Sequence, residues 1–213
     1  MAQSFSLKVV FSEETLKQIS GVGRYVVIQK DMEDETQTSG GDVKGEVTWF
    51  TFKPAQNSFI SWKNEYSVYM SSVALREGAV IQPNAIKEAE AGWQIYNYEK
   101  TGVFQGEDLK GGDKLKYYIK NVSEGPGTFG LAQAYVLNGT EQPKAPVNAV
   151  TLFNNETADF ITREKIKIFL SSDPQDGKVL RSVMSEPAEF DFTDIHERAV
   201  EYKLDRGKFV SID

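Results

Sequence analysis

The chain of 213 residues contains no cysteine, which excludes disulfide bonds, thiolate metal ligands and a cysteine nucleophile. Histidine is nearly absent as well, because His196 is its single occurrence. One histidine leaves only carboxylates to complete a zinc site, and no GxSxG motif supplies the serine of a Ser-His-Asp triad. We therefore expect His196 to lie on the surface between strands, and we predict no catalytic residue, no metal and no cofactor.

A surplus of positive charge is also missing, since 24 basic residues stand against 31 acidic ones and the formal net charge is −7. A field of that sign disfavours nucleic acid and anionic membranes as partners. No apolar run is long enough to cross a bilayer, and the first residues lack the basic and apolar regions of a secretory signal. The sequence accordingly predicts a soluble cytoplasmic protein, and release without a cleavable signal peptide stays open.

Hydrophobic residues make up 40 % of the chain and aromatic residues 12 %, which is enough for a packed core. Their dominant period is two, which is typical of strands with one buried face. On this pattern we predict short strands at residues 5–11, 24–30, 46–53, 59–63, 66–72, 93–98, 114–121, 129–137, 147–153, 165–171, 178–185, 189–192, 200–204 and 208–212.

One short helix interrupts the strands near the N-terminus. Ser12 is a suitable N-cap, acidic residues follow it in the first turn, and Gly21 ends the helix. Leu16 and Ile19 then face inward. The predicted fold class is all-β: a two-sheet, mostly antiparallel β-sandwich with one short N-terminal helix, forming a single domain over residues 1–213.

Two segments of the chain lack a clear period. Residues 138–146 contain two prolines, and we interpret them as a crossover loop between the sheets. Residues 78–92 form either a helical turn that begins at Pro83 or an irregular loop.

Residues 46–72 hold two tryptophans, three phenylalanines and two tyrosines at a spacing close to two. Side chains alternate across a strand, so the parity of a residue assigns it to one face. If the more apolar set faces the core, then Trp49, Phe59 and Tyr69 point the other way. One interpretation is that residues 78–92, residues 31–42 or a second subunit cover these rings, because large exposed apolar patches are uncommon on monomers.

The other interpretation is a ligand-binding platform, in which aromatic rings stack on the C–H face of a sugar and nearby amides bind its hydroxyls. The predicted ligand-binding residues are Trp49, Phe59, Tyr69, Trp62, Asn64, Tyr96, Asn97 and Tyr98. The leading prediction is a non-enzymatic protein, lectin-like or toxin-like, that recognises glycans or a glycan-bearing cell surface. The same mixture of aromatic and polar side chains suits peripheral contact with a zwitterionic membrane.

Two alternatives from other classes stay open. One is a self-assembling structural or inclusion-forming protein, a homo-oligomer whose aromatic faces bury each other between subunits. The other is a glycoside hydrolase, because that chemistry needs only two facing carboxylates, and the sequence neither identifies nor excludes such a pair. The acidic run at residues 31–35 lacks the spaced oxygens and the glycine of a calcium loop, so we expect a solvated loop there.

Overall fold

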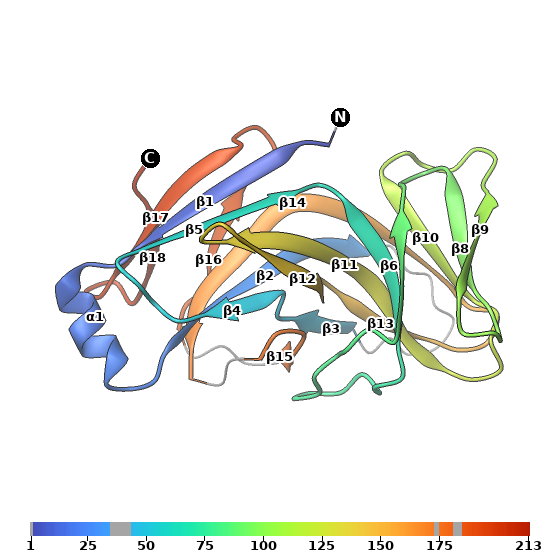
Figure 1. Cartoon of the computed structure of the whole chain (residues 1–213), viewed down its shortest axis with the longest axis horizontal. Coiled ribbons are helices and arrows are strands. Elements are labelled where there is room, and N and C mark those ends of the chain that lie inside the picture. The colour runs from blue at the N-terminus through green and yellow to red at the C-terminus, as the bar shows by residue number, and fades with distance from the viewer. Residues whose placement is uncertain (1, 35–43, 173–174, 181–184) are drawn as a thin grey trace.

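The chain folds into two layers of β-sheet in a computed structural model that describes residues 2–34, 44–172, 175–180 and 185–213 (Figure 1). Sheet A contains β1 Ser4–Val10, β3 Lys44–Val47, β5 Asn57–Lys63, β6 Tyr66–Ser71, β7 Ala85–Ala89, β11 Gly127–Leu137, β12 Thr140–Pro146, β13 Ala149–Leu152, β15 Val179–Leu180, β17 Glu197–Lys203 and β18 Lys208–Ser211. Sheet B contains β2 Tyr25–Asp34, β4 Phe50–Phe52, β8 Gln94–Tyr98, β9 Phe104–Asp108, β10 Lys116–Asn121, β14 Thr157–Ser171 and β16 Ala188–Asp191.

The predicted all-β, sandwich-like class is confirmed. Each sheet is mixed, because β1 pairs in parallel with β17 and β8 pairs in parallel with β10, while the other strand pairs are antiparallel. The β1–β17 pair places strands from the two ends of the chain side by side (Figure 1). The prediction of a single domain over residues 1–213 stays a prediction.

The predicted N-terminal helix is confirmed as α1 Glu13–Ser20. The hydroxyl of Ser12 accepts a hydrogen bond from the backbone N–H of Thr15 at 3.1 Å, which satisfies one of the unpaired donors of the first turn. Ile19 is buried and Leu16 packs against the core, so the helix covers one end of the sandwich with its apolar side.

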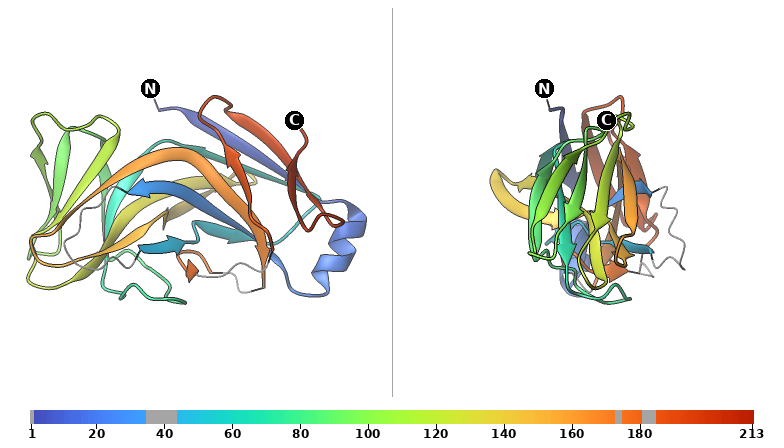
Figure 2. Two further views of the ribbon diagram at one scale, coloured as in Figure 1. Left: turned by 180° about the vertical axis from the view of Figure 1, so that it is seen from behind. Right: turned by 90° about the vertical axis from the view of Figure 1, so that its right-hand side faces the viewer.

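Aromatic rings from both sheets meet in the core. Phe50 of β4 stacks on Tyr135 of β11 with ring centroids 3.8 Å apart. Tyr66 of β6 contacts Tyr117 of β10 at 5.6 Å. The view along the long axis shows the two layers with the β11–β12 hairpin projecting from them (Figure 2, right). Over the described residues, no helix is long and apolar enough to cross a membrane.

A bulge interrupts one long strand of sheet A. Both β5 and β6 pair antiparallel with β11, and the six-residue step from Ser61 to Ser67 faces a four-residue step from Val136 to Ala132. Two extra residues, Asn64 and Glu65, therefore lie between β5 and β6, which together form one bent strand. The outer neighbour of this strand changes at the bulge, from β1 beside β5 to β7 beside β6.

Sheet B has a matching bulge in β14. Thr162 pairs with Met32 and Ile166 with Lys30, so a four-residue step in β14 faces a two-residue step in β2. The outer neighbour of β14 also changes here, from β10 to β16. Glu164 lies within this bulge, and its carbonyl accepts a hydrogen bond from the N–H of Phe192 at 2.6 Å.

Two segment predictions are wrong. Residues 138–146 are not a crossover loop, because Asn138 and Gly139, with φ of 50° and 81°, form a tight turn that returns the chain as β12 beside β11. The prolines are tolerated because β12 is an edge strand: among the described residues it pairs only with β11, so its other side does not need backbone N–H donors. Residues 78–92 contain neither a helical turn nor a purely irregular loop, since β7 pairs with β6.

The prediction of a solvated loop at residues 31–42 is wrong at its start, because the residues up to Asp34 belong to β2. Residues 35–42 lie outside the described part of the chain. The same holds for residues 181–184 of the predicted strand 178–185, of which the structure shows only Val179–Leu180 as β15.

Candidate functional site

Trp49 is completely buried, so the parity argument is wrong for this residue. Residues 46–53 are not one strand: the chain passes from β3 in sheet A to β4 in sheet B at Thr48 and Trp49. The indole lies between the layers, where its N–H donates to the carbonyl of Gln133 at 3.2 Å and its ring contacts Trp62 at 5.7 Å. Trp49 therefore belongs to the core.

Tyr69 lies on the outer face of sheet A, as parity predicts, but it too is completely buried. A second apolar cluster covers it, formed in part by the loop after β6 and by β15; its loop members are Val73, Leu75, Ala79 and Ile81. The Tyr69 hydroxyl donates to the carbonyl of Asn148 at 2.6 Å, and burial raises its pKa above the ordinary tyrosine value. Of this cover, only Ala79 and Ile81 belong to the residues 78–92 that the first interpretation named; Val73, Leu75 and Val179 lie outside them.

The remaining predicted site residues do not form one surface. Trp62, Tyr96 and Tyr98 are buried in the core, with exposed fractions of 4 %, 2 % and 9 %. Asn97 donates from its amide to Glu107 at 3.0 Å on sheet B. Asn64 is exposed, and its side-chain oxygen accepts from the N–H of Gln3 at 2.8 Å, which ties the start of β1 to the bulge between β5 and β6.

Phe59 is the one predicted aromatic residue that stays on the surface, with 57 % of its area exposed. The alternation of β5 points Phe59 and Ser61 away from sheet B, while Ile60 and Trp62 face the core as predicted. The backbone of Phe59 is fixed on both sides, because its N–H donates to the side chain of Asn138 and its carbonyl accepts from the N–H of Asn138, each at 2.8 Å. The ring is thus presented on a rigid strand.

A groove runs along this outer face of sheet A. It consists of two adjoining hollows of about 570 and 590 Å³, which share Ser61 and Val136 in their walls. Phe59 and Lys8 line the first hollow, where the Lys8 amine lies 5.7 Å from the centre of the Phe59 ring. The β11–β12 hairpin forms one side of both hollows, since residues from Val136 to Lys144 line them. We name this feature the β5 groove.

Both signs of charge occur along the β5 groove. The first hollow contains Lys8, Glu197, Arg198 and Asp213. The second contains Lys63, Glu65, Glu88, Glu141 and Lys144. Several of these charges already pair, as Lys144 does with Glu88 and Arg198 with Asp213, the latter at 3.8 Å. A balanced, partly neutralised surface of this kind favours an uncharged polar ligand over a strongly charged one.

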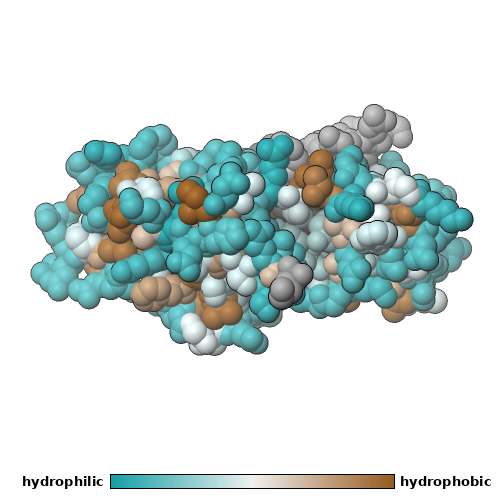
Figure 3. Space-filling model, turned by 90° about the horizontal axis from the view of Figure 1, so that it is seen from above, coloured by the Kyte–Doolittle hydropathy of each residue, from teal (hydrophilic) through white to brown (hydrophobic). Residues whose placement is uncertain are grey.

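A second exposed aromatic ring, Trp93, lines a different hollow. Seen from above, apolar atoms form separate patches in a mostly hydrophilic surface (Figure 3). Trp93 is 60 % exposed at the start of β8, where the Lys114 amine lies 5.7 Å from its ring. It lines a smaller, more open hollow of about 470 Å³ beside the glutamates Glu65, Glu88 and Glu90.

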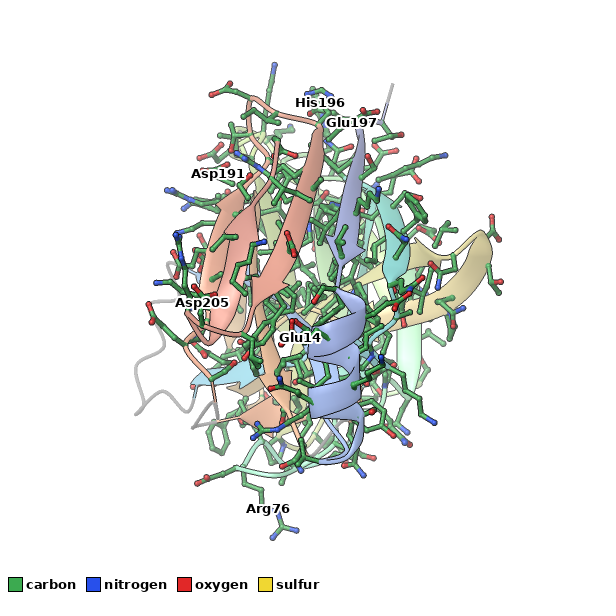
Figure 4. The ribbon with its side chains drawn as sticks, turned by 90° about the vertical axis from the view of Figure 1, so that its left-hand side faces the viewer. Glu14, Arg76, Asp191, His196, Glu197 and Asp205 are labelled. Carbon is green, nitrogen blue, oxygen red and sulfur yellow. The ribbon has the colours of Figure 1, made fainter. Side chains whose placement is uncertain are left out.

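His196 lies at the surface end of β17 beside Glu197, far from Glu14 of α1 (Figure 4). Its Nε2 is 2.5 Å from the side-chain nitrogen of Gln3, and its ring packs 5.4 Å from Phe5. The surroundings of His196 thus include an amide and an aromatic ring. Among the described residues, no group of three or more histidine, aspartate or glutamate side chains could hold a metal ion.

The most unusual chemistry lies between the layers, where the sequence analysis predicted none. Lys30 of β2 and Glu164 of the β14 bulge form an ion pair with Nζ and Oε2 2.5 Å apart, and their side chains are 0 % and 13 % exposed. Trp62 donates from Nε1 to the same oxygen at 2.9 Å, and the Tyr66 hydroxyl donates to Oε1 at 2.9 Å. We name these four residues the Lys30–Glu164 centre.

Burial changes the proton affinities in this centre. It lowers the pKa of Lys30 below the ordinary lysine value, while the charge of Glu164 and its hydrogen bond act in the opposite direction. Burial and the charge of Glu164 together raise the pKa of the Tyr66 hydroxyl well above its ordinary value. Both shifts favour the neutral forms of the two side chains.

A sequence signal for the Lys30–Glu164 centre does exist. Lys30 shares the parity of the buried Ile28, and Glu164 shares that of the buried Ile166. Two opposite charges therefore stand at core-facing positions of two strands, and a buried charge needs a partner of the opposite sign. What the sequence lacks is the pairing of β2 with β14, which brings together two residues 134 positions apart.

No protein-family model, no curated protein and no solved structure matches this chain. The function of this chain is therefore inferred from the geometry of the β5 groove and of the Lys30–Glu164 centre.

Proposed function

We propose that the protein is a non-enzymatic, lectin-like binding protein whose β5 groove recognises a glycan. The observation that carries this proposal is the exposed ring of Phe59 on a rigid strand, inside a groove lined with serines and with charged side chains of both signs. An aromatic face of this kind stacks on the C–H surface of a sugar ring, and hydroxyls and charged groups beside it bind the sugar hydroxyls.

The dimensions and the charge of the groove support the same ligand class. Two adjoining hollows of about 570 and 590 Å³ each have the volume of a small-ligand site, so an oligosaccharide can extend along β5 from one into the other. The hollows share the hydroxyl of Ser61 at their junction. The mixture of paired charges suits a neutral glycan better than a polyanion.

A glycan array followed by calorimetric titration tests the proposal. We expect Phe59→Ala to weaken binding of the selected glycan at least about tenfold, because the stacking face is lost. Ser61→Trp, which fills the junction of the two hollows, should abolish it. Phe153→Ala is the matched control: Phe153 is 54 % exposed but lies outside the groove, so its replacement should leave affinity unchanged.

Three results would contradict the proposal: no binding to any glycan, equal loss in the Phe59 and Phe153 variants, or hydrolysis of the bound glycan. Hydrolysis would favour the glycoside hydrolase prediction. A sedimentation coefficient that rises with concentration and falls back in the Phe59 variant would instead favour self-assembly through this face. Leakage of zwitterionic liposomes without glycan binding would favour the membrane prediction.

A further inference from the structure

The Lys30–Glu164 centre joins two neighbouring strands of sheet B through side chains that are almost completely removed from water. Nζ of Lys30 lies 2.5 Å from Oε2 of Glu164, and the lysine side chain has no exposed area. The amine is enclosed by rings: its distances to the ring centres of Trp49, Trp62 and Tyr66 are 5.2, 5.1 and 5.8 Å. An amine and a carboxyl group are thus held in contact in an apolar enclosure.

Such an enclosure weakens the usual preference for the charged forms. Removing an ammonium group from water is costly, so the enclosure favours the neutral, nucleophilic amine of Lys30. The burial that lowers the pKa of Lys30 acts in this direction. A lysine amine and a glutamate carboxyl group in contact are the two reactants of amide formation.

We propose that Lys30 and Glu164 condense to form an isopeptide bond that covalently links β2 to β14. Nζ of Lys30 attacks Cδ of Glu164, a C–N bond forms, and one carboxyl oxygen leaves as water. The two protons of that water come from the original ammonium group, whose third proton remains on the amide nitrogen. The step is a condensation, so it needs no oxidant, no reductant and no second substrate.

Tyr66 is placed to carry the proton that this step must move. Its hydroxyl lies 3.4 Å from Nζ of Lys30 and 2.9 Å from Oε1 of Glu164, so one group contacts both the nucleophile and a carboxyl oxygen. It can receive a proton from nitrogen as it gives its own to the departing oxygen. The raised pKa of Tyr66 keeps the hydroxyl protonated before the transfer.

Trp62 supplies a hydrogen-bond donor to the carboxyl group that reacts. Its indole N–H donates to Oε2 at 2.9 Å, and a fixed donor at that position stabilises negative charge as the tetrahedral intermediate forms. Glu164 shares the core-facing parity of β14, and its backbone carbonyl in the bulge is held by the N–H of Phe192. The reacting groups are therefore oriented by elements of both sheets.

The test is the intact mass of the purified full-length chain, measured after denaturation. We expect a mass lower than that of the sequence by about 18 Da, the mass of one water. After proteolysis, fragmentation should identify one branched peptide that contains both Lys30 and Glu164. The cross-linked form should also migrate faster than a linear chain on a denaturing gel, because the bond closes a large loop.

Two variants make the test specific. Lys30→Arg keeps the positive charge but replaces the nucleophilic amine with a guanidinium group. This variant should therefore show the full mass of its sequence. Tyr66→Phe keeps both reactants and removes only the hydroxyl, so we expect the cross-linked fraction to accumulate at least about tenfold more slowly. An equal rate in Tyr66→Phe would overturn the role of Tyr66 in proton transfer.

Two results would overturn the proposed bond itself. One is the full sequence mass after prolonged incubation at neutral and mildly acidic pH, which would mean that the centre is an ion pair only. The other is a loss of water located at Asp176-Gly177, where cyclisation of the aspartate gives the same mass change. Fragment spectra separate the two sites, because only the isopeptide bond joins two peptides.

Discussion

At the scale of single residues, the surroundings of an aromatic ring depend on what covers its face of the sheet. Phe59 and Tyr69 both point away from the layer between the sheets. Phe59 remains 57 % exposed in the β5 groove, whereas the loop after β6 and β15 bury Tyr69 completely. The two residues therefore differ in energetic role: Tyr69 contributes to stability, and Phe59 is available to a ligand.

Replacement of these two rings should separate the roles. Tyr69→Phe removes the hydroxyl that donates to Asn148 and leaves a buried carbonyl without that partner, so we expect a loss of about 1–3 kcal/mol in the free energy of unfolding. Phe59→Ser, at an exposed position, should change it by less than about 0.5 kcal/mol. Urea denaturation followed by circular dichroism measures both. Equal losses would contradict the assignment.

The candidate site was partly predictable at this scale. Alternation in β5 correctly places Ile60 and Trp62 in the core and Phe59 outside it. It fails at Trp49, because period two applies only within a strand and the chain changes sheets there. It does not distinguish exposed Phe59 from covered Tyr69, because the covering loop is a tertiary feature that local pattern does not contain.

At the scale of elements, two bulges decide how the sheets are built. Each bulge lies where a long strand changes its outer neighbour: β5–β6 from β1 to β7, and β14 from β10 to β16. The sequence marks the first with the polar run Lys63-Asn64-Glu65, which separates two strands that were predicted correctly. Their common partner β11 was not predictable, because strand pairing depends on contacts between distant segments.

The sequence around the turn at Asn138 and Gly139 contains two features that predict different structures. An Asn-Gly pair between strands is a strong indication of a two-residue hairpin. The two prolines that follow favour a loop instead, because proline cannot donate to a central strand. The order of strands in the sheet explains why both features occur together. Because β12 is an edge strand paired with β11, its prolines do not have to donate hydrogen bonds to a second neighbour.

A close approach between β11 and the β12–β13 segment gives a prediction for this part of the fold. A Cβ atom at Gly130 would lie 2.4 Å from the carbonyl oxygen of Asn148, which is backbone and cannot move aside easily. We expect Gly130→Ala to lower the free energy of unfolding by about 1–3 kcal/mol through overpacking. Thermal or urea denaturation measures the loss.

Gly125→Ala is the matched control, because nothing lies within 4 Å of the added methyl group at that position. This control should stay within about 0.5 kcal/mol of the parent protein. If both variants lost stability equally, the tight packing of β11 against Asn148 would be refuted.

At the scale of the whole molecule, several buried tyrosine hydroxyls lie in both sheets. Tyr66, Tyr69 and Tyr135 come from sheet A, and Tyr117 comes from sheet B. Burial raises the pKa of each above the ordinary tyrosine value, and that of Tyr117 reaches about 12. The native fold therefore keeps these phenols neutral at pH values where an unfolded chain would ionise them.

The consequence is a steep loss of stability in alkaline solution. An unfolded tyrosine loses its proton near pH 10, and a native one with a raised pKa does not, so between pH 10 and about 12 the unfolded state binds fewer protons. The free energy of unfolding should then be unaffected by these groups below pH 10 and fall as pH rises above it. Urea midpoints at pH 8, 10 and 11 measure the fall.

Tyr117→Phe removes one contributor without removing a ring, so its midpoint should decline less steeply than that of the parent protein. Parallel curves for the two proteins would show that Tyr117 ionises alike in both states, and the structural reason for its raised pKa would then be wrong.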